Sequence, residues 1–321
     1  MKITILGTGA LGIAIAKVIS ETKEVSLSMW TKFEEEKQLV KNTRANDKLL
    51  PGIKINENIE ITTNLKEAVD NATIVINCLP FVAVRSVAEE LKSVYSGQYI
   101  CSTTKGIDME TFETTTEIFS NELRTNKISA LSGPSFAIEI ANGKPISFVL
   151  ASRDKETLDI VYNLLSSKNI FIDKSTDEVG IQLCGAVKNA IAIGSGMLHG
   201  LNDVADSTKA AYLARGMKDM AKIISSLGGD EKTLSTYAGI GDLILTCTSN
   251  TSRNYSCGKL LGQGYSLDEA VQMLNGKTVE GIKIIESLNN YMKEKGLVLD
   301  TIPKLYDIVF NGKAVESIQR I

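Results

Sequence analysis

The chain has 321 residues, which is long enough for two domains that each bury a core. A net charge of −3 with 23% charged residues excludes the strongly basic surface that binds nucleic acid or an anionic membrane. The five cysteines show no C-x-x-C spacing, which favours free thiols in a reducing compartment over disulfides or a zinc site. A strand-like run directly after Met1 leaves no room for a signal peptide, so we expect a soluble, cytoplasmic protein without stable membrane insertion.

Strand-like and helical patterns alternate over the first half of the chain. Lys2–Leu6 is a β-rich run, and apolar residues at helical spacing follow from Leu11 to Ile19. Further runs of strand length lie at Val25–Trp30, Thr73–Leu79, Tyr99–Thr103, Ile128–Leu131 and Ser147–Ala151. Helical patterns lie between several of them, at Phe33–Lys41, Val82–Tyr95 and Thr111–Leu123. This alternation predicts an α/β fold with a doubly wound, mainly parallel sheet.

The pattern changes near Asp177, where long helical periodicities replace the strand-like runs. They lie at Val179–Leu198, Ser207–Leu227, Ser266–Leu274, Ile282–Lys295 and Pro303–Asn311. We therefore expect an α/β domain at residues 1–175 and an all-helical domain at 176–321. The apolar stretch Ala186–Leu198 is short for a membrane span, which favours a buried helix. Because no flexible linker separates the two domains, we expect them to share a cleft.

A glycine-rich turn follows the first strand-like run. Gly7, Gly9 and Gly12 fit the dinucleotide fingerprint, in which glycines allow a tight turn, close approach of a pyrophosphate and close packing of helix on strand. The N–H groups that begin the helix are suited to bind the phosphates. Thr31 and Lys32 stand where an acid would bind the ribose of NAD, and they tolerate or attract a 2′-phosphate, which favours NADP. A solvated surface lysine is the alternative for Lys32.

A lysine is the best candidate for acid–base chemistry. His199 is the one histidine, and its place beside Gly200 is more typical of a cap or surface group than of a base. Lys188 lies among small residues in Gly185–Ala190, where partial desolvation suits a lysine to proton transfer. Asn189 beside it is suited to hydrogen-bond a substrate hydroxyl or carboxamide. A helix lysine whose ammonium reaches solvent is the open alternative.

Two polar segments follow strand-like runs in the first half. Lys105 lies at the carboxyl edge of the expected sheet, where α/β folds bind ligands. The turn at residues 131–137 follows the next strand and is a second candidate for lining the cleft. Ordinary turn chemistry is the alternative for both, because glycine and proline interrupt loops everywhere.

A glycine-bounded polar stretch at residues 239–254 has the pattern of a partly buried helix start, with Asp242 as its one acid. Ser252, Arg253 and Asn254 close the stretch and combine two hydrogen-bonding side chains with a planar guanidinium suited to a phosphate. A solvated loop is the alternative for each residue taken alone.

Together these segments resemble the bacterial, soluble kind of NAD(P)-dependent glycerol-3-phosphate dehydrogenase. The similarity runs over nearly the whole chain, through GTGALGIAIA, TTKGI, LSGPSFAIEIA, GIQLCGAVKNAIAIGSGM, GIGDLILTCTSNTSRN and TVEG. The resemblance implies a Rossmann-like domain followed by a helical domain, NADP or NAD as cofactor, and a homodimer. It also implies reversible reduction of dihydroxyacetone phosphate to sn-glycerol 3-phosphate, which supplies glycerophospholipid synthesis.

The resemblance also implies roles for individual residues. It makes Lys188 the proton donor and acceptor, with Lys105 and Asp242 beside it at the reacting carbonyl. The implied substrate-binding residues are Lys105, Gly133, Ser135, Lys188, Asp242, Ser252, Arg253 and Asn254. The implied cofactor-binding residues are Gly7, Gly9, Ala10, Leu11, Gly12, Thr31, Lys32, Lys105, Ala137, Arg253, Thr278 and Glu280. No metal ligands are expected.

The chain departs from the family pattern after the Lys188 helix. Residues 200–211 read GLNDVADSTKAA, which is one residue longer than usual and carries additional acids. Ala10, Ala214 and Thr278 also replace residues more usual at their positions. If the altered turn borders the substrate, its negative charge weakens phosphate binding or shifts specificity; a neutral surface change is the other interpretation.

Two other functions stay open at this point. One is a related NAD(P) dehydrogenase acting on another phosphorylated or carboxylated hydroxy substrate. The other is a catalytically silent NADP(H)-binding sensor. Phosphate binding distinguishes the first, and turnover excludes the second.

Overall fold

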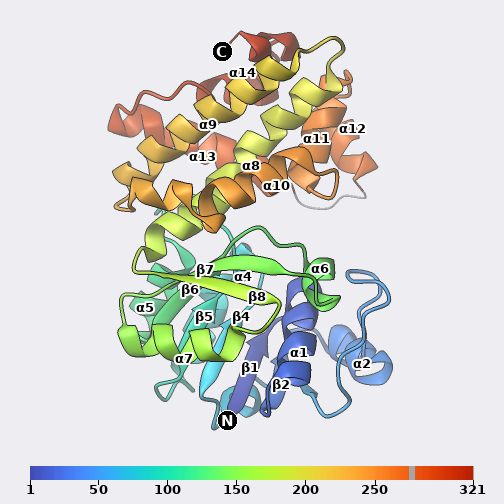
Figure 1. Cartoon of the computed structure of the whole chain (residues 1–321), viewed down its shortest axis with the longest axis vertical. Helices are drawn as coiled ribbons and strands as arrows, with labels where there is room; N and C mark the ends of the chain where they lie inside the picture. Colours follow the sequence, from blue (N-terminus) through green and yellow to red (C-terminus); the bar gives the residue numbers. More distant parts are fainter. Residues whose placement is uncertain (275–278, 321) are drawn as a thin grey trace. The chain divides into compact units, whose positions relative to one another are not determined.

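The computed structural model describes residues 1–274 and 279–320. The chain forms two compact units. The first comprises Met1–Gly106 and Glu113–Ile181, and the second comprises Ile107–Phe112 and Gln182–Ile321. Figure 1 traces the chain through both units, with strands in the first and helices throughout the second.

A single eight-stranded sheet organises the described part of the first unit. Its order is β3-β2-β1-β4-β5-β6-β7-β8, and all neighbouring strands run parallel except β6 and β7. The predicted doubly wound, mainly parallel sheet is therefore confirmed. The strands are β1 (Lys2–Leu6), β2 (Ser26–Trp30), β3 (Glu60–Thr62), β4 (Ile74–Asn77), β5 (Tyr99–Ser102), β6 (Ile128–Ser132), β7 (Ile146–Ala151) and β8 (Ile170–Ser175).

Helices cover both faces of this sheet. Alternating side chains of a strand point to opposite faces, so Ile3 and Ile5 of β1 join one core while Leu6 joins the other. The first core includes α1 and α7, which Figure 1 shows on the near side of the sheet, and the second includes α4 and α5. The helices are α1 (Ala10–Thr22), α2 (Glu34–Thr43), α3 (Leu65–Val69), α4 (Phe81–Lys92), α5 (Thr115–Leu123), α6 (Ala137–Ala141) and α7 (Lys155–Leu165).

Helix α5 begins four residues later than the predicted Thr111. Thr114 is its N-cap: the Thr114 hydroxyl accepts from the backbone of Glu117, and the Glu117 carboxylate accepts from the backbone of Thr114. This reciprocal capping box fixes the start of the helix. The preceding residues Ile107–Phe112 belong to the second unit, where the ring of Phe112 lies 4.5 Å from that of Tyr291.

Every described element after β8 is helical, as the sequence predicts. Short 3₁₀ helices lie at Glu231–Ser235 and Val315–Gln319, and a π-helical turn lies at Tyr237–Gly241. The α-helices are α8 (Glu178–Gly200), α9 (Asp206–Ser226), α10 (Asp242–Thr248), α11 (Arg253–Gly262), α12 (Leu267–Met273), α13 (Glu280–Lys295) and α14 (Ile302–Asn311).

Helix α8 is a buried core helix. Among the described helices it alone is long and apolar enough to span a membrane by length and composition, and its most apolar window is entirely buried in the protein. It is longer than the predicted apolar stretch, but the prediction of a buried helix is confirmed. Glycines let α11 approach it closely: a Cβ on Gly258 would lie 1.8 Å from the Ile193 carbonyl oxygen, and one on Gly196 2.0 Å from that of Tyr255.

Candidate functional site

Each glycine of the turn after β1 has a different structural role. Gly7 has a φ of +109°, which favours glycine, and a Cβ on Gly12 would lie 2.2 Å from the Gly7 carbonyl oxygen. These two glycines are therefore required by the turn and by helix packing. A Cβ on Gly9 would meet no atom of the described residues within 4 Å. The open space beside Gly9 fits a ligand that approaches the backbone, as the pyrophosphate of a dinucleotide does.

No side chain of the described residues caps the start of α1. Gly9 is its N-cap and supplies no side-chain cap, and the first turn, which begins at Ala10 and Leu11, contains no acid. The first N–H groups of a helix need acceptors and carry a positive partial charge. The turn and the helix start together fit the phosphates of NAD or NADP.

The end of β2 carries Thr31 and Lys32 in different surroundings. Thr31 is buried, and its hydroxyl donates to Glu36 at 2.7 Å. Lys32 is exposed, and its ammonium pairs with Glu90 at 3.0 Å. Sequence reasoning did not identify Glu36, which also accepts from the Thr8 hydroxyl at 2.8 Å.

Polar groups gather where β5 and β6 end. The Lys105 ammonium donates to the Gly133 carbonyl oxygen at 3.1 Å, and the Ser135 hydroxyl donates to the same oxygen at 3.4 Å. A Cβ on Gly133 would lie 2.6 Å from the Ser147 carbonyl oxygen, so close packing on β7 requires this glycine. Ala137 is the first residue of α6, directly after this turn.

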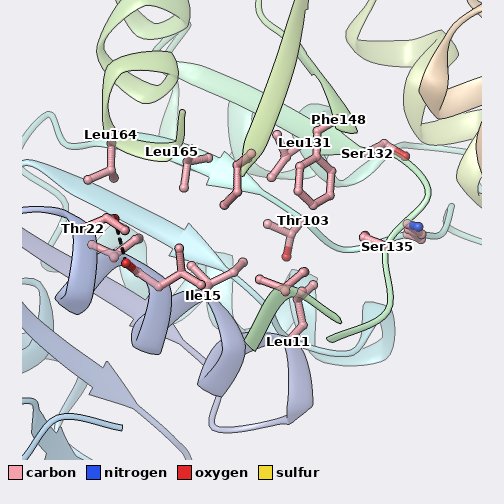
Figure 2. Close-up of a pocket in the computed structure, with 15 residues that line it drawn as sticks. Leu11, Ile15, Thr22, Thr103, Leu131, Ser132, Ser135, Phe148, Leu164 and Leu165 are labelled. Carbon is pink, nitrogen blue, oxygen red and sulfur yellow. Dashed lines mark hydrogen bonds between the residues drawn. The ribbon is translucent and has the colours of Figure 1, made fainter. Parts of the chain in front are cut away.

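Lys105 and Ser135 line one pocket together with the apolar side chains of α1 and α7 (Figure 2). Leu11 and Thr103 also line it, so it joins the start of α1 to the ends of the central strands. The Ser132 hydroxyl in its wall is buried and has no hydrogen-bond partner within the described ranges. A buried hydroxyl without a partner indicates room for a polar ligand group.

The centre of the second unit is a buried ion pair. The Lys188 ammonium of α8 lies 2.6 Å from Oδ1 of Asp242 and donates to the Thr246 hydroxyl at 2.7 Å. Lys188 is 5% exposed and Asp242 is 1% exposed, which excludes the alternative of a lysine that reaches solvent. Thr246 lies one turn after Asp242 on α10 and donates to its carbonyl oxygen at 2.7 Å. The Asp242 carboxylate and the Thr246 hydroxyl hold the ammonium in one position, as a directed proton transfer requires.

The predicted phosphate triplet forms the start of α11. The buried Ser252 is the N-cap, and its hydroxyl accepts from the backbone of Tyr255. Arg253 is exposed at the first helical position, where the helix dipole and its own guanidinium both favour an anion. Asn254 is buried, and its Oδ1 accepts from the backbone of Gly281 at 2.9 Å.

This last bond ties the start of α11 to the start of α13. Glu280 begins α13, and its carboxylate accepts from the Asn189 amide at 3.3 Å. Asn189 directly follows Lys188 on α8. Glu280 therefore contacts the sequence neighbour of the ion-paired lysine. Thr278 lies outside the described residues.

The structure thus brings together several predicted residues within each unit. Lys105 meets Gly133 and Ser135 in the first, and Lys188 meets Asp242 in the second. His199 is exposed near the end of α8, with Nδ1 3.0 Å from the Ser195 carbonyl oxygen, as expected of a surface group. Sequence reasoning missed Thr246, although its spacing of four residues from Asp242 places both on one helix face.

A doubly wound, mainly parallel sheet with a glycine-rich turn after its first strand is typical of dinucleotide-binding proteins, the class that includes nicotinamide-dependent dehydrogenases. Comparison with known proteins narrows this class. The family model described as NAD-dependent glycerol-3-phosphate dehydrogenase N-terminus matches residues 2–158, and the corresponding C-terminus model matches residues 177–320. The chain belongs to this family of oxidoreductases.

Individual relatives are similar to this chain over nearly their full length. A protein from Fusobacterium nucleatum named NAD(P)+ glycerol-3-phosphate dehydrogenase is 36% identical, over 100% of this chain and 96% of that protein. One of the same name from a Thermoanaerobacter species is also 36% identical, over 98% and 94% of the two chains. The crystal structure of glycerol-3-phosphate dehydrogenase from Coxiella burnetii superposes with a TM-score of 0.91 at 28% identity, covering 99% of this chain and 97% of that one.

Proposed function

We propose that this chain catalyses the reversible reduction of dihydroxyacetone phosphate to sn-glycerol 3-phosphate, with NADH or NADPH as the reductant. The product is a precursor for glycerophospholipid synthesis. The observation that carries the proposal is the buried Lys188–Asp242 pair, which lies in the unit matched by the C-terminal family model. The matching relatives are named for this reaction.

Most of the cofactor contacts fall to residues 1–175 in this proposal. The glycine-rich turn after β1 and the start of α1 support this assignment, since they offer N–H groups and open space to a pyrophosphate. A dinucleotide held there would supply the hydride that C2 of the substrate accepts. We assign dinucleotide contacts to Gly7, Gly9, Ala10, Leu11, Gly12, Thr31, Lys32, Lys105, Ala137, Arg253, Thr278 and Glu280.

The proton-transfer role falls to residues 176–321. Lys188 donates a proton from Nζ to the C2 oxygen as that oxygen gains charge, and takes it back in the reverse reaction. Asp242 and Thr246 orient the ammonium, since both lie within 2.7 Å of it. The Asp242 carboxylate also favours the charged ammonium, which opposes the effect of burial.

Substrate binding uses groups that attract the negative charge of the phosphate. Arg253 and the N–H groups at the start of α11 bind the phosphate, and Ser252 and Asn254 hold that helix start in place. Binding energy gained at the phosphate orients the distant carbonyl for reaction. We also assign substrate binding to Lys105, Gly133 and Ser135, as the family resemblance implies.

The chain is further proposed to act in the cytoplasm as a homodimer, an assembly that the family resemblance implies. Light scattering of the purified protein tests the assembly. A mass near twice 34.8 kDa supports the dimer, and the monomer mass contradicts it.

Replacing Lys188 by alanine tests the proposed reaction. We expect near-complete loss of dihydroxyacetone phosphate reduction, while NADH binding, measured by fluorescence titration without substrate, stays within about twofold of wild type. The control is Lys209→Ala on α9, which removes a lysine whose partner Asp206 is fully exposed. Substantial turnover by Lys188→Ala contradicts the proton-donor role.

A further inference from the structure

An acid of the first unit occupies a position that suits it to select the cofactor. Glu36 lies in the first turn of α2, twenty-four residues after Gly12. Its Oε2 accepts from two hydroxyls, that of Thr8 at 2.8 Å and that of Thr31 at 2.7 Å. Thr8 belongs to the glycine-rich turn and Thr31 directly follows β2. The carboxylate is thereby held where the ends of β1 and β2 meet.

The Thr8 and Thr31 hydroxyls hold the Glu36 carboxylate in one position. Thr8 is 1% exposed and Thr31 is 3% exposed, whereas Glu36 is half-buried. The buried Asn46 amide donates to the Thr8 carbonyl oxygen at 3.1 Å and fixes the turn from its other side. Both hydroxyl protons point to Oε2, and Oε1 accepts no hydrogen bond from any residue that the structure describes.

The charge of Glu36 is not neutralised by an ion pair in the described structure. The lysines on either side in sequence pair with other acids, Lys32 with Glu90 at 3.0 Å and Lys37 with Glu34 at 3.0 Å. A free carboxylate oxygen at this edge accepts a hydrogen bond from a ribose hydroxyl. It repels a ribose phosphate, which carries a charge of about −1.5 to −2 at neutral pH.

We propose that Glu36 binds the adenosine ribose and makes this chain prefer NADH over NADPH. The inference rests on the proposed function, because it concerns the same dinucleotide site. It reverses the preference for NADP that Thr31 and Lys32 led us to expect. In the structure Thr31 holds the acid in place, and Lys32 is engaged elsewhere.

Binding measured without turnover tests this assignment. NADH and NADPH are titrated into the protein by fluorescence in the absence of dihydroxyacetone phosphate, and the ratio of the two Kd values is compared among variants. We expect wild type to bind NADH at least about tenfold more tightly than NADPH, which is the scale of one charge-assisted hydrogen bond. In Glu36→Gln the ratio falls about tenfold, because the amide keeps the Thr8 and Thr31 bonds but loses the charge.

Glu35→Gln is the matched control. It removes the same charge from the adjacent, exposed residue of the same helical turn, and we expect the ratio to change less than twofold. Equal effects of the two substitutions, or a wild-type preference for NADPH, would overturn the role of Glu36. If neither NADH nor NADPH bound, the cofactor site itself would be overturned, which separates that outcome from a failed ribose assignment.

Discussion

Removing one member of the Lys188–Asp242 pair leaves the other charge buried without a counter-ion. The two side chains lie 2.6 Å apart and are both buried. At an effective dielectric constant near 20, charges at that distance attract by about 6 kcal/mol. Much of this attraction offsets the cost of taking both charges out of water. The net loss on breaking a buried pair is therefore about 3–5 kcal/mol.

A double-mutant cycle measures this coupling. The variants are Lys188→Met, Asp242→Leu and the two together, and urea unfolding followed by circular dichroism gives the free energy of each. We expect each single substitution to lower the free energy of unfolding by about 3–5 kcal/mol. The double variant recovers most of that loss, because no unpaired charge stays buried. Simple addition of the two single losses would refute the reasoning, since it would show that the two groups do not interact.

Three further outcomes are expected. Arg253→Ala raises KM for dihydroxyacetone phosphate about tenfold or more and leaves KM for unphosphorylated dihydroxyacetone little changed. Similar changes in KM for both ketones count against phosphate binding by Arg253. Asp219→Ala lowers the free energy of unfolding, measured by urea titration, by about 2–4 kcal/mol. The reason is that the buried Asp219 carboxylate accepts from three consecutive backbone N–H groups at the start of α14. A loss below about 0.5 kcal/mol, the size of a typical surface substitution, contradicts this. Burial raises the pKa of the Cys101 and Cys247 thiols from 9.0 to about 12, so only the unfolded chain loses these protons just above pH 9. The free energy of unfolding is therefore unaffected by these thiols below pH 9, and between pH 9 and 12 it falls by about 1.4 kcal/mol per pH unit for each thiol. Urea titrations at several pH values, compared with a variant carrying alanine at both positions, isolate this slope, and equal slopes refute it.

The sequence predicts the sheet well because its central strands are continuous apolar runs, as strands buried on both faces must be. It fails at the sheet edges. Strand β3 has only three residues, two of them polar, and β8 exposes Phe171, Asp173 and Lys174. Such strands are held by pairing with a neighbour rather than by their own pattern, so composition alone does not reveal them.

The same distinction applies to the candidate site. Lys188 stands out in sequence because small residues surround it, and Asp242 because it is the one acid of a glycine-bounded stretch. The structure pairs them across a separation of 54 positions. Glu36 does not stand out, because it is one of three consecutive acids and only its contacts with Thr8 and Thr31 distinguish it. Residues that act through tertiary contacts become visible only when the chain is folded.

The altered turn at residues 200–211 is also clearer in the structure. Its acids Asp203 and Asp206 are exposed, and Asp203 has a φ of +55° at the bend between α8 and α9. Asp206 pairs with Lys209 at 3.0 Å as α9 begins. These contacts are those of a surface turn, which favours the interpretation of a neutral change.

The most direct test of the account is oxidation of NADH and NADPH, followed by absorbance, with dihydroxyacetone phosphate as the substrate. We expect turnover with formation of sn-glycerol 3-phosphate, and a higher kcat/KM with NADH than with NADPH. A folded protein that binds either dinucleotide but shows no turnover with this substrate would contradict it.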